Sequence, residues 1–132
     1  MLERVRTGDV IHSSCTDINM PCRHSGIVIE HNFDKYILHN TPDGLNKYGG
    51  TIIATRLDEF ANERAIYEVV KTGISKERIL RTYDIHKHKV WDAIDFNCED
   101  FISYVVNSEQ SSDVRDAWSL IFLSVVLLIF ID

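Results

Sequence analysis

The sequence has little cysteine and proline and no long run of basic residues. Only 3 Cys and 2 Pro occur among its 132 residues, and an odd number of cysteines does not complete a set of disulfide pairs. The chain shows no cationic leader followed by an apolar stretch, so we do not expect a secreted protein built on disulfides. We expect a reducing, cytoplasmic compartment.

Acidic residues outnumber basic ones, 20 against 14, and the net charge is -6. Nucleic-acid binding depends on clustered positive charge that neutralises phosphates, so nucleic acid is not an expected partner. The length fits one compact domain, whose folding buries about 68 % of the surface of the unfolded chain without help from disulfides.

One uncharged apolar run occupies residues 117–131, with the sequence AWSLIFLSVVLLIFI. It is apolar on every side, whereas a helix lying on a small domain should have a polar face. A helix of this length spans about 22 Å, less than the ~30 Å hydrocarbon core, so a buried core segment is the alternative. We expect a domain over 1–113 and a C-terminal membrane anchor over 114–132, with the bilayer as partner of 117–131.

The rest of the chain alternates between strand and helix patterns. Strands are predicted at 8–12, 25–30, 35–39, 51–55 and 65–70. Residues 31–34 separate the second and third strands, which predicts a hairpin with a four-residue loop. An acidic segment, 57–63, separates the last two strands, and a helix is predicted from Lys76 to about Tyr83. The fold class is therefore α+β, with an antiparallel sheet followed by helices.

The most regular helical pattern begins at Asn97-Cys98. Asn97 is a preferred N-cap, and Asp100 stands where a carboxylate completes a capping box. Cys98 is then the first helical residue, where free backbone N–H groups and the helix dipole lower the pKa of a thiol. The pattern indicates a nucleophile, with plain core packing as the alternative. Apolar side chains recur at the spacing of one helical face: Cys98, Phe101, Ile102, Val105 and Val106.

The predicted hairpin brings two histidines together. If Glu30 pairs with Lys35, then Gly26 faces His39, and His24 lies on the same face two residues along. One histidine can then act as a base and the second can hold it by a ring hydrogen bond, which completes a nucleophile, a base and an orienting group. A shift of one residue in register would place the two on opposite faces. A solvated or hydrogen-bonded strand residue is the alternative for each histidine.

Four segments together resemble a known family. They are GDVI at 8–11, HSGIVIE at 24–30, YILHNTP at 36–42 and NCEDF at 97–101. Their order is similar to that of the lecithin retinol acyltransferase-like family, which includes the H-rev-type phospholipid acyltransferases. That family is a circularly permuted branch of the NlpC-type papain-like thiol enzymes. The SSDVRD segment at 111–116 and the apolar tail are similar to the link and membrane anchor of the H-rev-type members.

The resemblance implies a permuted papain-like domain in which Cys98 is the nucleophile, His24 the base and His39 the orienting residue. Asn97 would cap the helix whose first N–H groups contribute to an oxyanion hole. The sequence departs from the family at Ser25-Gly26, where the family has Trp-Ala, and at Asp100, where it has His. Picornaviral H-box/NC proteins share the same motifs.

The expected function is a membrane-tethered thiol phospholipase or acyltransferase, which passes an acyl group from a phospholipid to water or to an amine or hydroxyl acceptor. It requires neither a metal nor an organic cofactor. A catalytically inactive viral protein that binds host proteins or membranes is the alternative, and a soluble papain-like amidase or peptidase is a third. Zinc is not expected at Cys15, Cys22, His24 and His12, because they lack paired C-x-x-C spacing.

Overall fold

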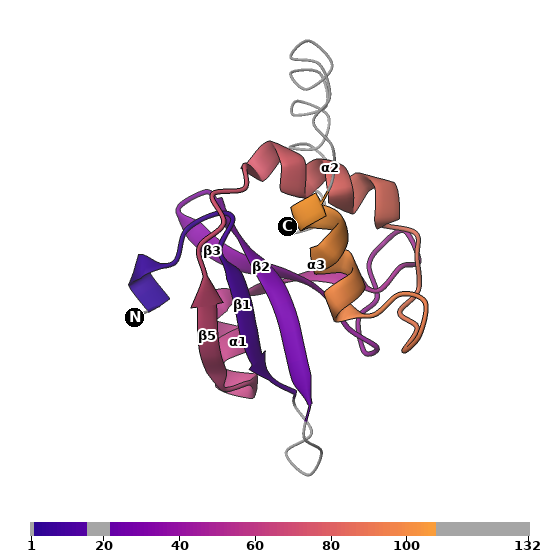
Figure 1. The fold of residues 1–132 in the computed structure, drawn as a ribbon, viewed down its shortest axis with the longest axis horizontal. Coiled ribbons are helices and arrows are strands. Elements are labelled where there is room, and N and C mark those ends of the chain that lie inside the picture. The colour runs from indigo at the N-terminus through magenta and orange to yellow at the C-terminus, as the bar shows by residue number, and fades with distance from the viewer. Residues whose placement is uncertain (1, 16–21, 108–132) are drawn as a thin grey trace.

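The computed structural model describes residues 2–15 and 22–107 (Figure 1). Five strands form one sheet in the order β4-β3-β2-β1-β5, and each neighbouring pair is antiparallel. The predicted α+β class with an antiparallel sheet is confirmed. The strands are β1 (Val10–Ser14), β2 (Arg23–His31), β3 (Asp34–Asn40), β4 (Ile52–Arg56) and β5 (Ile66–Val70). The helices are a 3-10 turn at Leu2–Arg4, α1 (Leu57–Glu63), α2 (Lys76–His86) and α3 (Cys98–Asn107).

The hairpin of β2 and β3 has the predicted register but a shorter turn. Glu30 pairs with Lys35 as predicted, and His31 also pairs with Asp34. The loop therefore has two residues, Asn32 and Phe33, in place of the expected four. Both have positive φ, 50° and 68°. This is the backbone of the tight turns whose twist matches that of two antiparallel strands.

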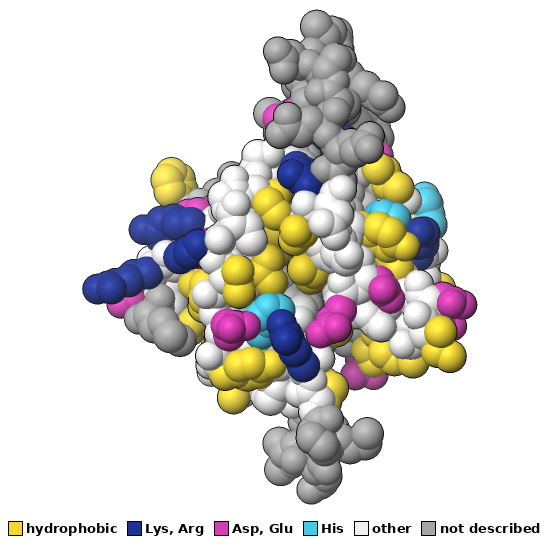
Figure 2. Space-filling view, viewed as in Figure 1, with side chains coloured by type: hydrophobic (Ala, Val, Ile, Leu, Met, Phe, Trp, Pro, Cys, Tyr) yellow, Lys and Arg dark blue, Asp and Glu magenta, His cyan; other side chains and the backbone are white. Residues whose placement is uncertain are grey.

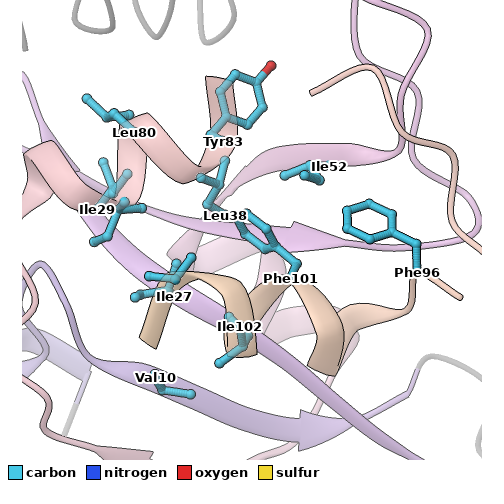
Figure 3. Close-up of a cluster of buried hydrophobic side chains, with 12 residues drawn as sticks. Val10, Ile27, Ile29, Leu38, Ile52, Leu80, Tyr83, Phe96, Phe101 and Ile102 are labelled. Carbon is cyan, nitrogen blue, oxygen red and sulfur yellow. The ribbon is translucent and has the colours of Figure 1, made fainter. Parts of the chain in front are cut away.

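The sheet is covered on both faces because its strands alternate apolar side chains. Ile27 and Leu38 face a core shared with α2 and α3, where Phe101 is fully buried (Figure 3). Val28 and Ile37 face the other way and pack against Phe60 of α1. In Figure 1, α3 lies in front of the sheet and α1 behind it. The fold thus has a sheet between helices.

Two helices differ from the sequence prediction. The acidic segment between β4 and β5 is a helix, α1, which Leu57 and Phe60 anchor by burial at i and i+3. Helix α2 starts at the predicted residue, and the Ser75 hydroxyl accepts a hydrogen bond from the Arg78 N–H at 3.2 Å. It continues to His86, beyond the predicted end near Tyr83.

Cys15 and Cys22 form a disulfide, which the sequence analysis did not predict. They lie just beyond the ends of β1 and β2, where Ser14 pairs with Arg23. Antiparallel pairing therefore places the two cysteines opposite each other. The pairing of β1 with β2 indicates this disulfide, whereas the odd number of cysteines does not. The third cysteine, Cys98, is free and buried.

The expected anchor over 114–132 lies outside the described residues. Within 2–15 and 22–107, no helix combines the length and the apolar character that a membrane crossing requires. The boundary between a domain at 1–113 and a tail therefore stays a prediction.

Candidate functional site

Cys98 is the first residue of α3, and a complete capping box precedes it, as the sequence predicts. The Asn97 side-chain oxygen accepts hydrogen bonds from the N–H groups of Glu99 at 2.9 Å and Asp100 at 3.0 Å. In return, the Asp100 carboxylate accepts one from the Asn97 N–H at 2.8 Å. The Asn97 amide nitrogen donates to the carbonyl of Ala93. Asn97 is thus occupied as a cap and holds the start of the helix.

Asn40, at the end of β3, ties this helix start to the sheet. Its buried amide donates to the carbonyls of Phe96 and Asn97, at 3.0 and 3.2 Å. Its oxygen accepts the Thr51 hydroxyl at 2.6 Å. Because Asn40 is fully buried, these bonds satisfy polar groups that water cannot reach. The two bonds from the Asn40 amide hold the backbone just before Cys98 against the end of β3.

His24 and His39 lie together, as the predicted register requires. Nε2 of His24 is 2.7 Å from Nδ1 of His39, and Nε2 of His39 is 2.8 Å from the Thr55 hydroxyl. A Cβ on Gly26 would lie 2.4 Å from a methyl of Ile37 and 3.1 Å from the His39 Cβ, so the close approach of β3 requires glycine. The two imidazoles and the hydroxyl form one hydrogen-bonded chain.

The two histidines are neutral because they are buried. Burial, with a smaller contribution from the nearby Arg64 guanidinium, lowers the pKa of His24 to about 4. Burial likewise holds the pKa of His39 well below its ordinary value, with His24 and Arg64 adding to the effect. The Phe60 ring packs against both imidazoles, with centroids 6.0 and 5.2 Å away. Each ring is thus available as an uncharged hydrogen-bond partner.

The surroundings of Cys98 correct one expectation. Burial raises the pKa of its thiol, and the Glu99 carboxylate adds to the increase, while the Ser25 N–H acts in the opposite direction. We expected the helix start to lower this pKa. Desolvation outweighs the helix end because Cys98 is only 9 % exposed. The resting side chain is a thiol, and it points to the Arg23 carbonyl at 3.9 Å.

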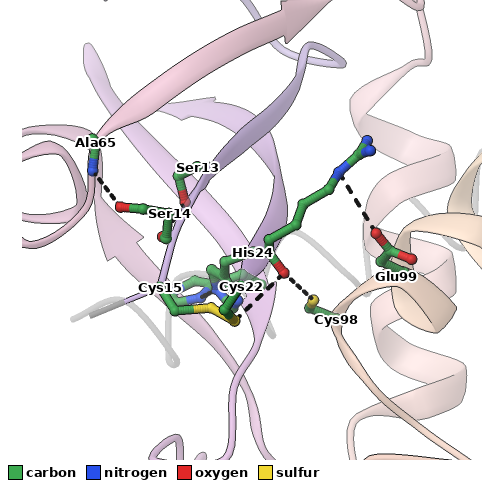
Figure 4. Close-up of a disulfide and its surroundings, with 10 residues drawn as sticks. Ser13, Ser14, Cys15, Cys22, His24, Ala65, Cys98 and Glu99 are labelled. Carbon is green, nitrogen blue, oxygen red and sulfur yellow. Dashed lines mark hydrogen bonds and ion pairs between the residues drawn. A yellow bond between two sulfur atoms is a disulfide. The ribbon is translucent and has the colours of Figure 1, made fainter. Parts of the chain in front are cut away.

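Cys98 and His24 line the same cavity, whose volume is about 560 Å³. The disulfide forms part of its wall, and Figure 4 shows Cys22 and Cys98 directed at the same Arg23 carbonyl oxygen. Pro42, Asp43 and Trp91 also line this cavity. It is the place where a substrate could reach the thiol and the imidazole together.

The two groups enter the cavity from opposite faces of the sheet. His24 and His39 lie on the face of α1, as their contacts with Phe60 show, whereas Cys98 begins the helix on the other face. Among the described residues, the thiol makes no hydrogen bond to the His24 ring; its acceptor is the Arg23 carbonyl. His24 is therefore bonded directly to His39, and among the described residues Cys98 and His24 share only the cavity that both line.

A third histidine, His12, lies on the face that α3 covers. Its Nδ1 is 2.8 Å from the Ser25 hydroxyl, and its Nε2 is 3.6 Å from a carboxylate oxygen of Glu68. The Arg23 guanidinium lies against the same ring and 3.6 Å from Glu99. Charged side chains of both signs gather around a histidine on the face seen in Figure 2. No group of side chains in the described part of the chain is arranged to hold a metal ion.

Three residues near the histidines were not singled out from the sequence: Thr55, Phe60 and Arg64. Thr55 pairs with Ile37, which lies two residues before His39 on the same face of β3, and register arithmetic could have placed it. Phe60 belongs to α1, and Arg64 is the residue that follows this helix. Because α1 was not predicted, no sequence signal placed them beside the histidines.

The chain matches no protein-family model, no curated protein and no solved structure. Its function must therefore be argued from the site itself.

Proposed function

We propose that the protein is a thiol enzyme of the permuted papain-like type. It cleaves a phospholipid ester through an acyl-enzyme on Cys98 and passes the acyl group to water or to an amine or hydroxyl acceptor. The observation that carries the proposal is the shared cavity. It contains a helix-start thiol and an imidazole held by a second imidazole and a hydroxyl.

The hydrogen-bonded chain supports His24 as the base. If Nε2–H of His24 donates to His39 and Nε2–H of His39 donates to Thr55, then Nδ1 of His24 is left to accept a proton. When His24 takes up a proton, the bond to His39 strengthens because its donor becomes charged. His39 is thus a positioning residue, and Thr55 fixes its ring.

The reaction has two balanced steps. In the first, the Cys98 sulfur attacks the ester carbonyl carbon while its proton passes to His24; the C–O bond then breaks, and His24 returns the proton to the leaving alcohol. In the second, the acceptor gives a proton to His24 and attacks the thioester carbonyl carbon; the C–S bond then breaks, and His24 returns the proton to the Cys98 sulfur. Because the pKa values make both resting groups neutral, proton removal must accompany attack.

The thiol has to turn from the Arg23 carbonyl into the cavity before it can meet His24. An S–H group is a weak donor, and its 3.9 Å contact with this carbonyl is easily exchanged. The Cys98 N–H and the helix end lie beside the sulfur, where an oxyanion would form. The apolar run at 117–131 would keep the cavity at a bilayer.

The test is to incubate the detergent-solubilised full chain with phosphatidylcholine that carries a labelled acyl group. We expect a thioester-linked acyl adduct that Cys98→Ala abolishes and that Ser103→Ala, a change on an exposed position of α3, leaves intact. His24→Gln should slow adduct formation by a factor of about 10² to 10⁴. An adduct that survives Cys98→Ala, or no adduct with the wild-type chain, would refute the proposal.

One observation favours a second function, a non-catalytic protein that binds host proteins or membranes. The described residues leave Cys98 without a hydrogen bond to His24, and its thiol pKa is raised. This alternative predicts no adduct, together with unchanged membrane or partner binding in Cys98→Ala.

A further inference from the structure

Arg64 is a buried cation beside the histidines. Its side chain is 8 % exposed, and the guanidinium carbon lies 4.9 Å from the centre of the Phe60 ring, which also packs against His24 and His39. Its ion-pair partner, Glu63, is 62 % exposed and binds one terminal nitrogen at 3.3 Å. The positive charge of Arg64 is thus buried, and the exposed Glu63 carboxylate balances it only in part.

One donor of this guanidinium is left over. Within the described part of the chain, the Nε of Arg64 is buried and has no hydrogen-bond partner. A buried donor without an acceptor costs free energy, and a charged donor costs more than a neutral one. Such a group is stable where a ligand completes its hydrogen bonds.

A small recess of about 70 Å³ lies at this position, lined by Cys15, His24, Thr41, Pro42, Asp43 and Arg64. The first two of these residues, together with Pro42 and Asp43, also line the large cavity that contains Cys98. The recess is therefore a side compartment of the candidate active site, with a buried cation at its wall.

We propose that this recess is a phosphate-binding subsite in which the Arg64 guanidinium turns its unpaired Nε–H toward a phosphate oxygen. The arginine fork matches an oxyanion, and a charge-assisted bond would satisfy the donor that the protein leaves unpaired. Thr41, which carries a hydroxyl, is a further polar residue in the lining of the recess.

Asp43 determines which phosphate suits the recess. Its residue is exposed, and its carboxylate lies close enough to Arg64 to favour the charged guanidinium. A carboxylate at the wall repels a second negative charge, so it favours a phosphodiester with one charge over a dianionic phosphate. Taking a lipid phosphodiester as the source rests on the proposed function, because the ester that Cys98 would attack belongs to the same molecule.

Binding can be followed without catalysis, through the NMR titration of His24 in the detergent-solubilised full chain. The Arg64 charge lowers the pKa of His24, so an anion that offsets this charge should raise it from about 4. The probes are inorganic phosphate and glycerophosphocholine, each compared with chloride at equal ionic strength to remove general screening. A saturable upward shift is expected with either probe.

Variants decide whether Arg64 is responsible. Arg64→Gln should raise the pKa of His24 without any probe and weaken probe binding by about 10- to 100-fold. Arg64→Lys keeps the charge but not the Nε donor, and provides a second test if the Gln variant does not fold. Arg56→Gln is the matched control, because Arg56 precedes α1, is exposed and pairs with Asp34 and Asp58.

Three outcomes would overturn the subsite: no shift in the wild-type chain, a shift that persists in Arg64→Gln, or equal loss in Arg56→Gln. A response to glycerophosphocholine identifies the phosphodiester as a source, whereas a response to inorganic phosphate alone identifies free phosphate. With the His24 ring shifts followed at about pH 8, where inorganic phosphate is a dianion, Asp43→Asn should tighten inorganic phosphate more than glycerophosphocholine. The result is independent of the acyl-adduct assay, since the subsite can bind phosphate even if Cys98 forms no adduct.

Discussion

The buried pair of histidines should make the protein sensitive to mild acid. In the folded chain, burial lowers the pKa of His24 from 6.5 to about 4, whereas an unfolded chain restores the ordinary value. Between these two values the unfolded state binds a proton that the folded state does not. The free energy of unfolding therefore falls as the pH decreases from about 6.5 to about 4.

The size of the effect follows from the shift. Each pKa unit corresponds to 1.36 kcal/mol, so His24 alone should remove about 3 kcal/mol of stability when the pH falls from 6.5 to 4. His39 shifts in the same direction and adds to the loss. Because a domain of this size is stabilised by roughly 5 to 15 kcal/mol, such a loss is readily measured.

Urea denaturation at several pH values tests this reasoning by comparing the wild-type chain with His24→Gln. A glutamine cannot take up a proton, and carboxylates contribute equally to both proteins. The difference between their unfolding free energies should therefore change by about 3 kcal/mol between pH 6.5 and 4. Parallel pH profiles for the two proteins would show that His24 titrates normally and that the burial argument is wrong.

Two further predictions concern the supports of the site. Asn40→Ala should lower the free energy of unfolding by about 2 kcal/mol, because the carbonyls of Phe96 and Asn97 lose their donor. Thr51→Val removes only the one hydrogen bond to the same amide and should lower it by less. Equal losses for the two variants in urea denaturation would contradict this prediction. Replacing both Cys15 and Cys22 with Ser should cost about 2.5 kcal/mol through the loss of a short closed loop. Adding reductant to the wild-type chain should produce the same loss, and an unchanged urea midpoint would refute it.

The histidine pair could be predicted from the sequence because one assigned residue pair in a hairpin fixes all the other pairs of its two strands. Once Glu30 was paired with Lys35, the positions of Gly26, His24 and His39 followed, and the structure confirms them. The turn was predicted too long because Phe33 is not a residue expected at positive φ. The error did not matter for the pair, since adding one paired residue on each strand keeps the register.

The elements that complete the site could not be predicted in the same way. Helix α1 has only 7 residues, and its two buried side chains, Leu57 and Phe60, are less than one turn apart in an acidic segment. Its apolar periodicity is therefore too short to recognise. Its packing brings Arg64 beside the histidines, a contact between segments far apart in sequence. The Cys98 pKa was misjudged for a related reason, because burial depends on tertiary packing that the helix pattern does not contain.

The placement of the thiol and the imidazole on opposite faces limits how the two can meet. Both lie near the start of β2, where the Arg23 carbonyl is 3.9 Å from the Cys98 sulfur and the next residue is His24. In the proposed reaction the Cys98 side chain would turn while the Asn97 cap and the Asn40 bonds stay in place. The start of β2 is held by the Cys15–Cys22 disulfide and by pairing with β1. The shape of the cavity therefore depends on the same strand end that supplies His24.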